Sequence, residues 1–421
     1  MRKLSILTCL VLLASPLAIT QANAATPKLG GACSKVGTNA VAKGVKFTCV
    51  QSGMKLVWSK GVASTSTSTA TNTSQENPIP ITLPAVPTGL ITFDNIDKHI
   101  ADISEAAYTA VQKVEATNSL PNIPFVVQIG PNTNPAVPDV SAKFQKIMKL
   151  WSGFRQPVSY YALLYNFQDK DWALKTASKT PKVISTGGVE GLKNMMQQCS
   201  APNKCSGANS GIGNEGTYGV GFGQFGMDPA HIAQDPYFLV GVIFGHEYTH
   251  STQAAQFLGN PNIGKPNTEM QNKYGLSNSP SGLYEGALPC WFQEGQANFV
   301  GASAEASTLS DYLGWRVHMA KGHPIPEFTN YSAASLTNVL LTDNPPTCLS
   351  TPIYELGYGI GALVIEALTA IAGPQSTMAV VTLLGRGQTY EKAFQNVYGI
   401  SWVKAVPILA KVAAAEYATT P

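Results

Sequence analysis

Charge is scarce in this sequence. Only 13% of its 421 residues are charged, the formal net charge is +3, and no basic stripe or run of like charge occurs. Proteins that bind nucleic acid or an anionic membrane surface by electrostatic attraction carry such patches. The sequence therefore gives no electrostatic case for either partner. Histidine is also scarce, with six in the chain, so a close grouping of histidines carries weight.

Long apolar runs are rare outside the N-terminus. Residues 1–24 have the three parts of a secretory signal peptide: Arg2 and Lys3, an apolar stretch over 4–19, and a small-residue cleavage site at 22–24. The best later candidate for a membrane span, 357–373, carries Glu366 in its middle, which favours a buried helix. We expect an exported protein, secreted or at the cell surface, without a membrane span.

The sequence contains no C-x-x-C motif and no cysteine spacing typical of a thiolate zinc site. Six cysteines remain after the signal peptide, an even number that favours disulfides in an exported chain. Sequence alone leaves the connectivity open. Pairing by neighbourhood predicts the bonds Cys33–Cys49, Cys199–Cys205 and Cys290–Cys348.

Two short regions precede the main domain, which we place at residues 87–421. Residues 26–62 have two cysteines and alternating apolar positions, which predict short strands held together by a disulfide. They resemble small two-cysteine modules near the N-termini of exported bacterial proteins, a resemblance that implies no activity. Contact with the cell envelope and a plain spacer both remain open. Residues 63–86, rich in Ser, Thr and Pro, predict a linker.

The first part of the main domain mixes helical and strand patterns, which predicts an α+β fold with a mixed sheet. Glycine alternates with larger residues over 219–226, and we expect an edge strand there whose bare backbone could pair with an extended peptide. A phosphate loop is discounted because the required Lys and glycine order are missing. The other expected elements are helices near 96–114 and 141–154, strands at 125–129 and 158–167, and a loop over 190–217.

The motif His-Glu-x-x-His occurs at residues 246–250, after an apolar segment that predicts a buried helix. On a helix, His246 and His250 share one face, so both imidazoles can reach one metal ion. Imidazole is a common zinc ligand, and Glu247 lies where a carboxylate could take a proton from an attacking water. An accidental match on an exposed turn is the alternative, and the apolar setting argues against it.

A catalytic zinc site typically has three protein ligands, so one more is needed. Glu294 lies in an apolar helical stretch, where an unpaired carboxylate would be costly to bury unless a metal offset the cost. Asn298 lies one turn later and could orient a histidine ligand. Glu285 is a rival ligand, but its Gly and Pro neighbours predict a loop. We therefore favour Glu294 as the third ligand.

Together with Trp291-x-x-Glu294-Gly295-x-Ala297, the His-Glu-x-x-His motif resembles the gluzincin branch of the zincin metallopeptidases. The similarity extends over about residues 219–410 and includes a C-terminal helical part. It implies a zincin-like catalytic domain with Zn²⁺ on His246, His250 and Glu294, and Glu247 as general base. It also implies oxyanion stabilisation by a tyrosine, Tyr358 or, alternatively, Tyr354. An insertion rich in Pro, Asn and Gly at 260–280 lengthens the gap between the ligands.

These features predict an exported zinc peptidase that acts on a peptide or protein substrate. His231, His318 and His323 could also stabilise an oxyanion, but an isolated histidine is more often structural. Two alternatives remain: a binding or envelope protein on the same scaffold without turnover, and a zinc hydrolase of a non-peptide bond. The presence of Glu247 weighs against the first, because a binding scaffold has no need of a general base.

Overall fold

The computed structural model describes residues 28–29, 31–35, 38–42, 45–52, 55–60, 89–213, 219–233, 241–322 and 325–421. These residues belong to two compact units that divide between Thr73 and Ser74. The expected signal peptide at 1–24 and the expected linker at 63–86 lie outside the described residues.

The described part of the N-terminal unit is a three-stranded antiparallel sheet in the order β1-β2-β3. A disulfide joins Cys33 to Cys49, which is fully buried and lies opposite Trp58 in the neighbouring strand. The buried disulfide helps to order a unit that has few apolar side chains for a core. The strands are β1 (Asn39–Ala42), β2 (Val45–Ser52) and β3 (Lys55–Lys60).

The C-terminal unit is α+β, with one mixed sheet and many helices. The sheet order is β4-β5-β7-β6, in which β4, β5 and β7 are parallel and β6 is antiparallel to β7. The strands are β4 (Phe125–Ile129), β5 (Ser159–Tyr165), β6 (Ser206–Ile212) and β7 (Val220–Met227).

The predicted glycine-rich edge strand is wrong in its position. This strand is β7, which lies between β5 and β6 and is buried along its whole length. Its glycines accommodate Tyr160 of β5, because a Cβ at Gly223 would collide with the Tyr160 hydroxyl. The edge strand next to β7 is β6, which falls where a loop was expected. That loop prediction is also wrong at α5 (Gly188–Gln198), the helix that precedes β6.

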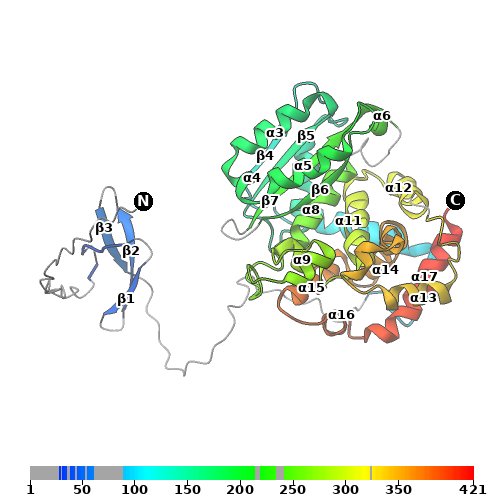
Figure 1. Cartoon of the computed structure of the whole chain (residues 1–421). Coiled ribbons are helices and arrows are strands. Elements are labelled where there is room, and N and C mark those ends of the chain that lie inside the picture. The colour runs from blue at the N-terminus through cyan, green and yellow to red at the C-terminus, as the bar shows by residue number, and fades with distance from the viewer. Residues whose placement is uncertain are drawn as a thin grey trace, which may run out of the picture. The chain divides into compact units, whose positions relative to one another are not determined.

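Helices cover both faces of the sheet, as the alternation of side chains along β5 requires. Tyr160, Ala162 and Leu164 point into the large core, while Leu163 and Tyr165 point into a smaller one. Figure 1 shows the helices of residues 170–198 over the face with the smaller core. These helices are α3 (Lys170–Lys179), α4 (Pro181–Ser185) and α5.

The large core lies between the other face of the sheet and helices from earlier and later parts of the chain. The elements that precede or flank the sheet strands are η1 (Ile96–Lys98), η2 (Ile100–Asp102), α1 (Ile103–Thr117), α2 (Val140–Leu150), η3 (Phe167–Asp169) and α6 (Pro229–Ile232). The later ones are α8 (Val242–Ala255), α9 (Thr268–Tyr274), α10 (Pro280–Glu285), α11 (Cys290–Glu305), α12 (Leu309–Lys321), α13 (Ala333–Thr342), η4 (Thr347–Ser350), η5 (Pro352–Glu355), η6 (Gly357–Gly361, a π-helical turn), α14 (Ala362–Ala372), α15 (Pro374–Gly385), α16 (Tyr390–Tyr398) and α17 (Trp402–Thr419).

Among the described residues, the segment Pro352–Ala372 is long and apolar enough to cross a membrane, and so is the bent pair α16–α17. In Pro352–Ala372, 78% of the most apolar window is buried within the unit. Glu366 inside this segment is fully buried and accepts hydrogen bonds from Arg316 and Tyr312. The packing is that of a core helix.

Both disulfides that were expected in the main domain are present, Cys199–Cys205 and Cys290–Cys348. With Cys33–Cys49, they confirm the pairing by neighbourhood. The bond from Cys290 attaches the first residue of α11 to η4, close in sequence to η5 and η6.

Candidate metal centre

Two histidines project from one face of α8. His246 and His250 are one turn apart, and their Nε2 atoms lie 3.0 Å from each other. Their residues are only 4% and 6% exposed. The helix begins after Gly241, whose φ of 84° is the left-handed conformation that glycine adopts without strain. The predicted helix and its register are confirmed.

The third member of the group is Glu294 on α11. Its Oε2 lies 3.3 Å from Nε2 of His246 and 3.4 Å from Nε2 of His250. This buried oxygen has no hydrogen-bond donor among the described residues. Because an unsatisfied buried carboxylate oxygen is costly, its convergence with two imidazole nitrogens fits a metal ion. His246, His250 and Glu294 could hold one.

The other nitrogen of each imidazole faces an amide oxygen. Nδ1 of His246 is 2.6 Å from Asn298 Oδ1, and Nδ1 of His250 is 2.9 Å from Gln253 Oε1. The amide orientations are fixed because their nitrogens donate to the carbonyl oxygens of Tyr358 and Gln293. An amide oxygen only accepts, so each Nδ1 carries a proton and Nε2 keeps the lone pair that a metal requires.

His250 and Glu294 shift each other's pKa towards the charged forms. Burial would raise the pKa of Glu294, but His250 and His246 hold it well below its usual range. Burial would lower the pKa of His250, but Glu294 and Glu247 raise it to about 9. The site therefore favours a positive charge beside the ionised Glu294, and a bound cation would supply it.

Glu247 lies beside the ligands without belonging to the group. Its residue is 5% exposed, and burial raises the pKa of its carboxyl, against the opposing effect of His246 and His250. The carboxylate accepts a hydrogen bond from the backbone of Ser210 in β6. Glu247 is therefore held between the histidine pair and the edge strand of the sheet.

Two tyrosines from η5 and η6 complete the site. Tyr354 donates a hydrogen bond of 2.5 Å to Oε1 of Glu294, and its hydroxyl is 3.2 Å from that of Tyr358. The ring of Tyr358 stacks on the imidazole of His246 at 5.9 Å and an interplanar angle of 5°. Both candidate tyrosines thus reach the site, but Tyr354 holds the third ligand while Tyr358 lies over the first.

Close backbone contacts bring the elements of the site together. A Cβ on Gly295 of α11 would collide with the carbonyl carbon of Gly361 in η6. A Cβ on Gly301 of α11 would lie only 2.9 Å from the carbonyl oxygen of Val242 in α8. Glycine is needed at these positions because any larger side chain would separate the helix that carries Glu294 from the elements that carry His246 and Tyr358.

The predicted loop setting of Glu285 is wrong, because Glu285 is the last residue of α10. Pro280 starts this helix, and the Ser279 side chain accepts from the Gly282 N–H at its N-terminus. Glu285 lies outside the metal-ligand group. Burial raises its pKa to about 7, and His250 opposes this rise.

Sequence reasoning missed two partners of His250. Gln253 lies three residues later on the same helix, a spacing that could have indicated the contact. The hydroxyl of Tyr284 in α10 is 3.4 Å from Nδ1 of His250, and no local signal indicates it. His318 is on α12, outside the ligand group. His323 and the side chain of His231 lie outside what the structure describes.

Comparison of the chain with protein-family models, with curated proteins and with solved structures gives no match.

Proposed function

We propose that the chain is an exported zinc-dependent peptidase. One observation carries the proposal: two imidazoles and a carboxylate converge in a buried group, with a second carboxylate, Glu247, beside them and bonded to the edge strand. Two histidines and a glutamate form a donor set that catalytic zinc uses. A purely structural metal site would have no use for the adjacent Glu247.

Zinc held by His246, His250 and Glu294 would polarise the scissile carbonyl and acidify the attacking water. Glu247 takes the proton from this water and delivers it to the leaving amine. Its raised pKa suits that role, because a base whose pKa is closer to neutral can also return the proton. The hydroxyl of Tyr358, above the His246 ring, donates to the developing oxyanion.

The sheet edge supports a peptide as substrate. In the register of β6 with β7, Gly207, Asn209 and Gly211 are at the hydrogen-bonded positions, so the intervening Ala208 and Ser210 direct their backbone groups outward. The Ser210 N–H donates to Glu247, which leaves both backbone groups of Ala208 and the carbonyl oxygen of Ser210 at this edge. An extended peptide can pair with such an edge by main-chain hydrogen bonds. Ser281 of α10 bonds to both backbone groups of Ile212, which ends the available edge. The hydrogen bond from the Ser210 backbone holds the Glu247 carboxylate next to this edge.

Export is part of the proposal. Three disulfides favour an oxidising compartment, and the N-terminal residues have the pattern of a signal peptide.

The decisive experiment compares Glu247→Gln with Glu294→Gln in the mature protein, using a mixed peptide library with and without a chelator. We expect Glu247→Gln to retain zinc while hydrolysis falls by about 10²- to 10⁴-fold, the loss typical of a missing general base. Glu294→Gln should lose zinc affinity together with activity, because a neutral amide is a poor replacement for an anionic ligand.

Two results would overturn the proposal. One is a wild-type chain that binds zinc but cleaves nothing in a broad library, which would favour a binding protein. The other is a Glu247→Gln variant as active as wild type. Cleavage of ester or glycan substrates alone would instead favour a zinc hydrolase of a non-peptide bond.

A further inference from the structure

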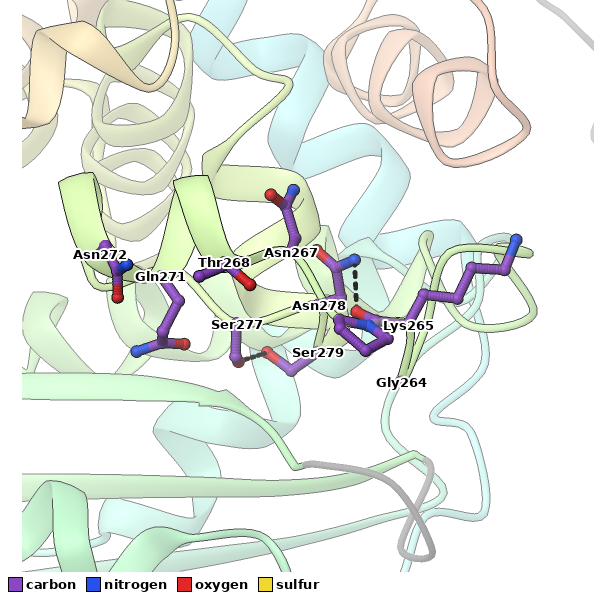
Figure 2. A pocket seen from close by; sticks show the side chains of 10 residues that line it. Gly264, Lys265, Asn267, Thr268, Gln271, Asn272, Ser277, Asn278 and Ser279 are labelled. Atoms are coloured by element: carbon purple, nitrogen blue, oxygen red, sulfur yellow. Dashed lines mark hydrogen bonds between the residues drawn. The ribbon is translucent and has the colours of Figure 1, made fainter.

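The insertion between the metal ligands forms a pocket of about 410 Å³. Figure 2 shows its lining side chains, which come from α9 on one side and the turn at 277–279 on the other. The side chain of Lys265, the one charged residue of the lining, extends away from the other side chains in the figure. The remaining lining side chains are amides, hydroxyls and a proline.

Several lining residues hold the wall in shape. Asn278 donates to the carbonyl oxygen of Lys265, Ser277 bonds to Ser279, and Asn267 accepts from the backbone at the start of α9. In contrast, the side-chain polar groups of Thr268 and Asn272, which are both exposed, make no hydrogen bond within the described part of the chain. They lie one turn apart on α9 and are available to a ligand.

The pocket is tied to the metal centre through α10. Ser279 of the lining caps this helix, Ser281 bonds to Ile212 at the end of β6, and Tyr284 contacts His250. Five helical residues from Ser279 to Tyr284 span about 8 Å, and the Tyr284 ring is 6.4 Å from the His250 ring. At about 3.3 Å per residue, an extended peptide covers this distance in about four to six residues.

We propose that this pocket is a substrate subsite that selects an uncharged polar side chain, Asn, Gln, Ser or Thr, about four to six residues from the scissile bond. The inference rests on the proposed peptidase function. A peptide paired with β6 leaves the edge at Ile212, where Ser281 occupies the backbone groups, and continues towards the pocket. Amides and hydroxyls both donate and accept, so they match these side chains. An apolar side chain would displace water from these groups without replacing its hydrogen bonds. A charged one would meet no opposite charge among them, because Lys265 extends away from the other lining side chains.

The test uses a peptide that the enzyme cleaves, extended on either side and carrying Asn, Leu or Glu at the fourth, fifth or sixth position from the cut. For wild type we expect KM to be about tenfold lower with Asn than with Leu at one of these positions, the size of one or two neutral hydrogen bonds. The value of kcat should stay the same, because remote contacts bind substrate and transition state alike.

The double variant Thr268→Leu/Asn272→Leu should reverse this ratio in favour of Leu. A matched control is Glu269→Leu/Lys273→Leu, which places two leucines at the same spacing on α9 outside the pocket and leaves the net charge unchanged. The control should keep the preference for Asn. Because each ratio is taken within one variant, differences in protein stability cancel.

Different failures have different meanings. If wild type cleaves the parent peptide but treats Asn and Leu alike at every position, the subsite is wrong while the peptidase assignment stands. If the zinc-loaded chain cleaves no peptide, the proposed function fails and the subsite fails with it. If Glu247→Gln binds an N-acetylhexosamine oligomer, and the two leucines abolish this binding without affecting peptides, the pocket is a carbohydrate site instead.

Discussion

Tyr354 donates its hydroxyl to Oε1 of Glu294, the carboxylate oxygen that does not face the histidines, at 2.5 Å. The second oxygen, Oε2, is thereby directed towards Nε2 of His246 and His250. The neighbouring Tyr358 stacks its ring on His246, and its hydroxyl lies 3.2 Å from that of Tyr354. Two tyrosines four residues apart thus have different tasks.

The first prediction separates these two tasks. Tyr354→Phe should lower zinc affinity by about 10- to 100-fold, the usual effect of losing a partner that orients a ligand. Tyr358→Phe should retain zinc but reduce kcat by about 10²- to 10³-fold, as expected for a lost oxyanion donor. Chelator competition measures the first effect, and peptide hydrolysis at saturating zinc measures the second. Equal zinc loss in both variants would contradict the assignment.

The second prediction concerns the partner of His246. Asn298→Leu removes the acceptor for Nδ1 at nearly constant size, so zinc affinity should fall by about 10- to 100-fold. Asn298→Asp keeps an acceptor and should retain most of the affinity. Chelator competition distinguishes them. If the Leu and Asp variants bound zinc equally well, the hydrogen bond would have no role in orienting the ligand.

A third prediction concerns the long disulfide. Cys290 and Cys348 are 58 residues apart, and replacing both by Ala should lower the free energy of unfolding by about 4 kcal/mol in the chain-entropy model. Cys199 and Cys205 close a loop of only six residues, and the same double replacement there should lower it by about 2 kcal/mol. Denaturant unfolding measures both. A smaller loss for the longer loop would contradict the model.

The fourth prediction is a pH dependence at the start of α11. Asp343 accepts from the backbone N–H of Trp291, and burial raises the pKa of its carboxyl from 3.8 to about 6. The folded state therefore holds this proton more tightly than the unfolded state. Between about pH 4 and pH 6, ionisation of Asp343 should lower the free energy of unfolding by up to about 3 kcal/mol.

Asp343→Asn cannot ionise, so its stability relative to wild type should rise between pH 4 and pH 7. Urea unfolding at both pH values measures this difference. If the difference in free energy of unfolding between the variant and wild type stayed constant with pH, or changed in favour of wild type, burial would not disfavour the ionised form of Asp343.

The fifth prediction tests the contact between α11 and η6. Gly295→Ala should lower the free energy of unfolding by about 1 to 3 kcal/mol, because the added methyl group meets the Gly361 backbone. It should also lower activity by displacing Tyr358. Gly314→Ala on α12 is the control, because a Cβ there meets nothing within 4 Å. A Gly295→Ala variant as stable as this control would contradict the close approach.

The sequence was sufficient for much of the candidate site. The spacing of His246 and His250 determines their common face once the helix is assumed, and the same logic led to Glu294 and Asn298 in one helix. These contacts depend on helical periodicity, which is local. Gln253 followed the same rule and could have been found.

The order of the strands could not be derived in this way. β7 is buried on both faces and β6 consists of Ser, Gly, Ala, Asn and Ile, so one resembled an exposed glycine strand and the other a loop. The order of strands depends on pairing between segments that are distant in sequence, and the local strand propensity of each segment does not determine that pairing. The prediction of a loop at Glu285 was wrong because it relied on the neighbouring glycines, whereas Ser279 and Pro280 form a helix start. The contact of Tyr284 with His250 depends on tertiary packing.

The backbone contacts at Gly295 and Gly301 have a consequence for how the chain can vary. At these two glycines, α11 lies in direct backbone contact with η6 and α8. The distances between these three elements therefore do not depend on which apolar side chains fill the core. Core residues such as Leu363 and Val364 can therefore be exchanged for others of similar volume, with changes in stability but little change at the ligands. The two glycines have no comparable substitutes. The accuracy of the site thus depends on positions without side chains, of which Gly361, against the Trp291 backbone, is another. The larger core determines how firmly the site is held.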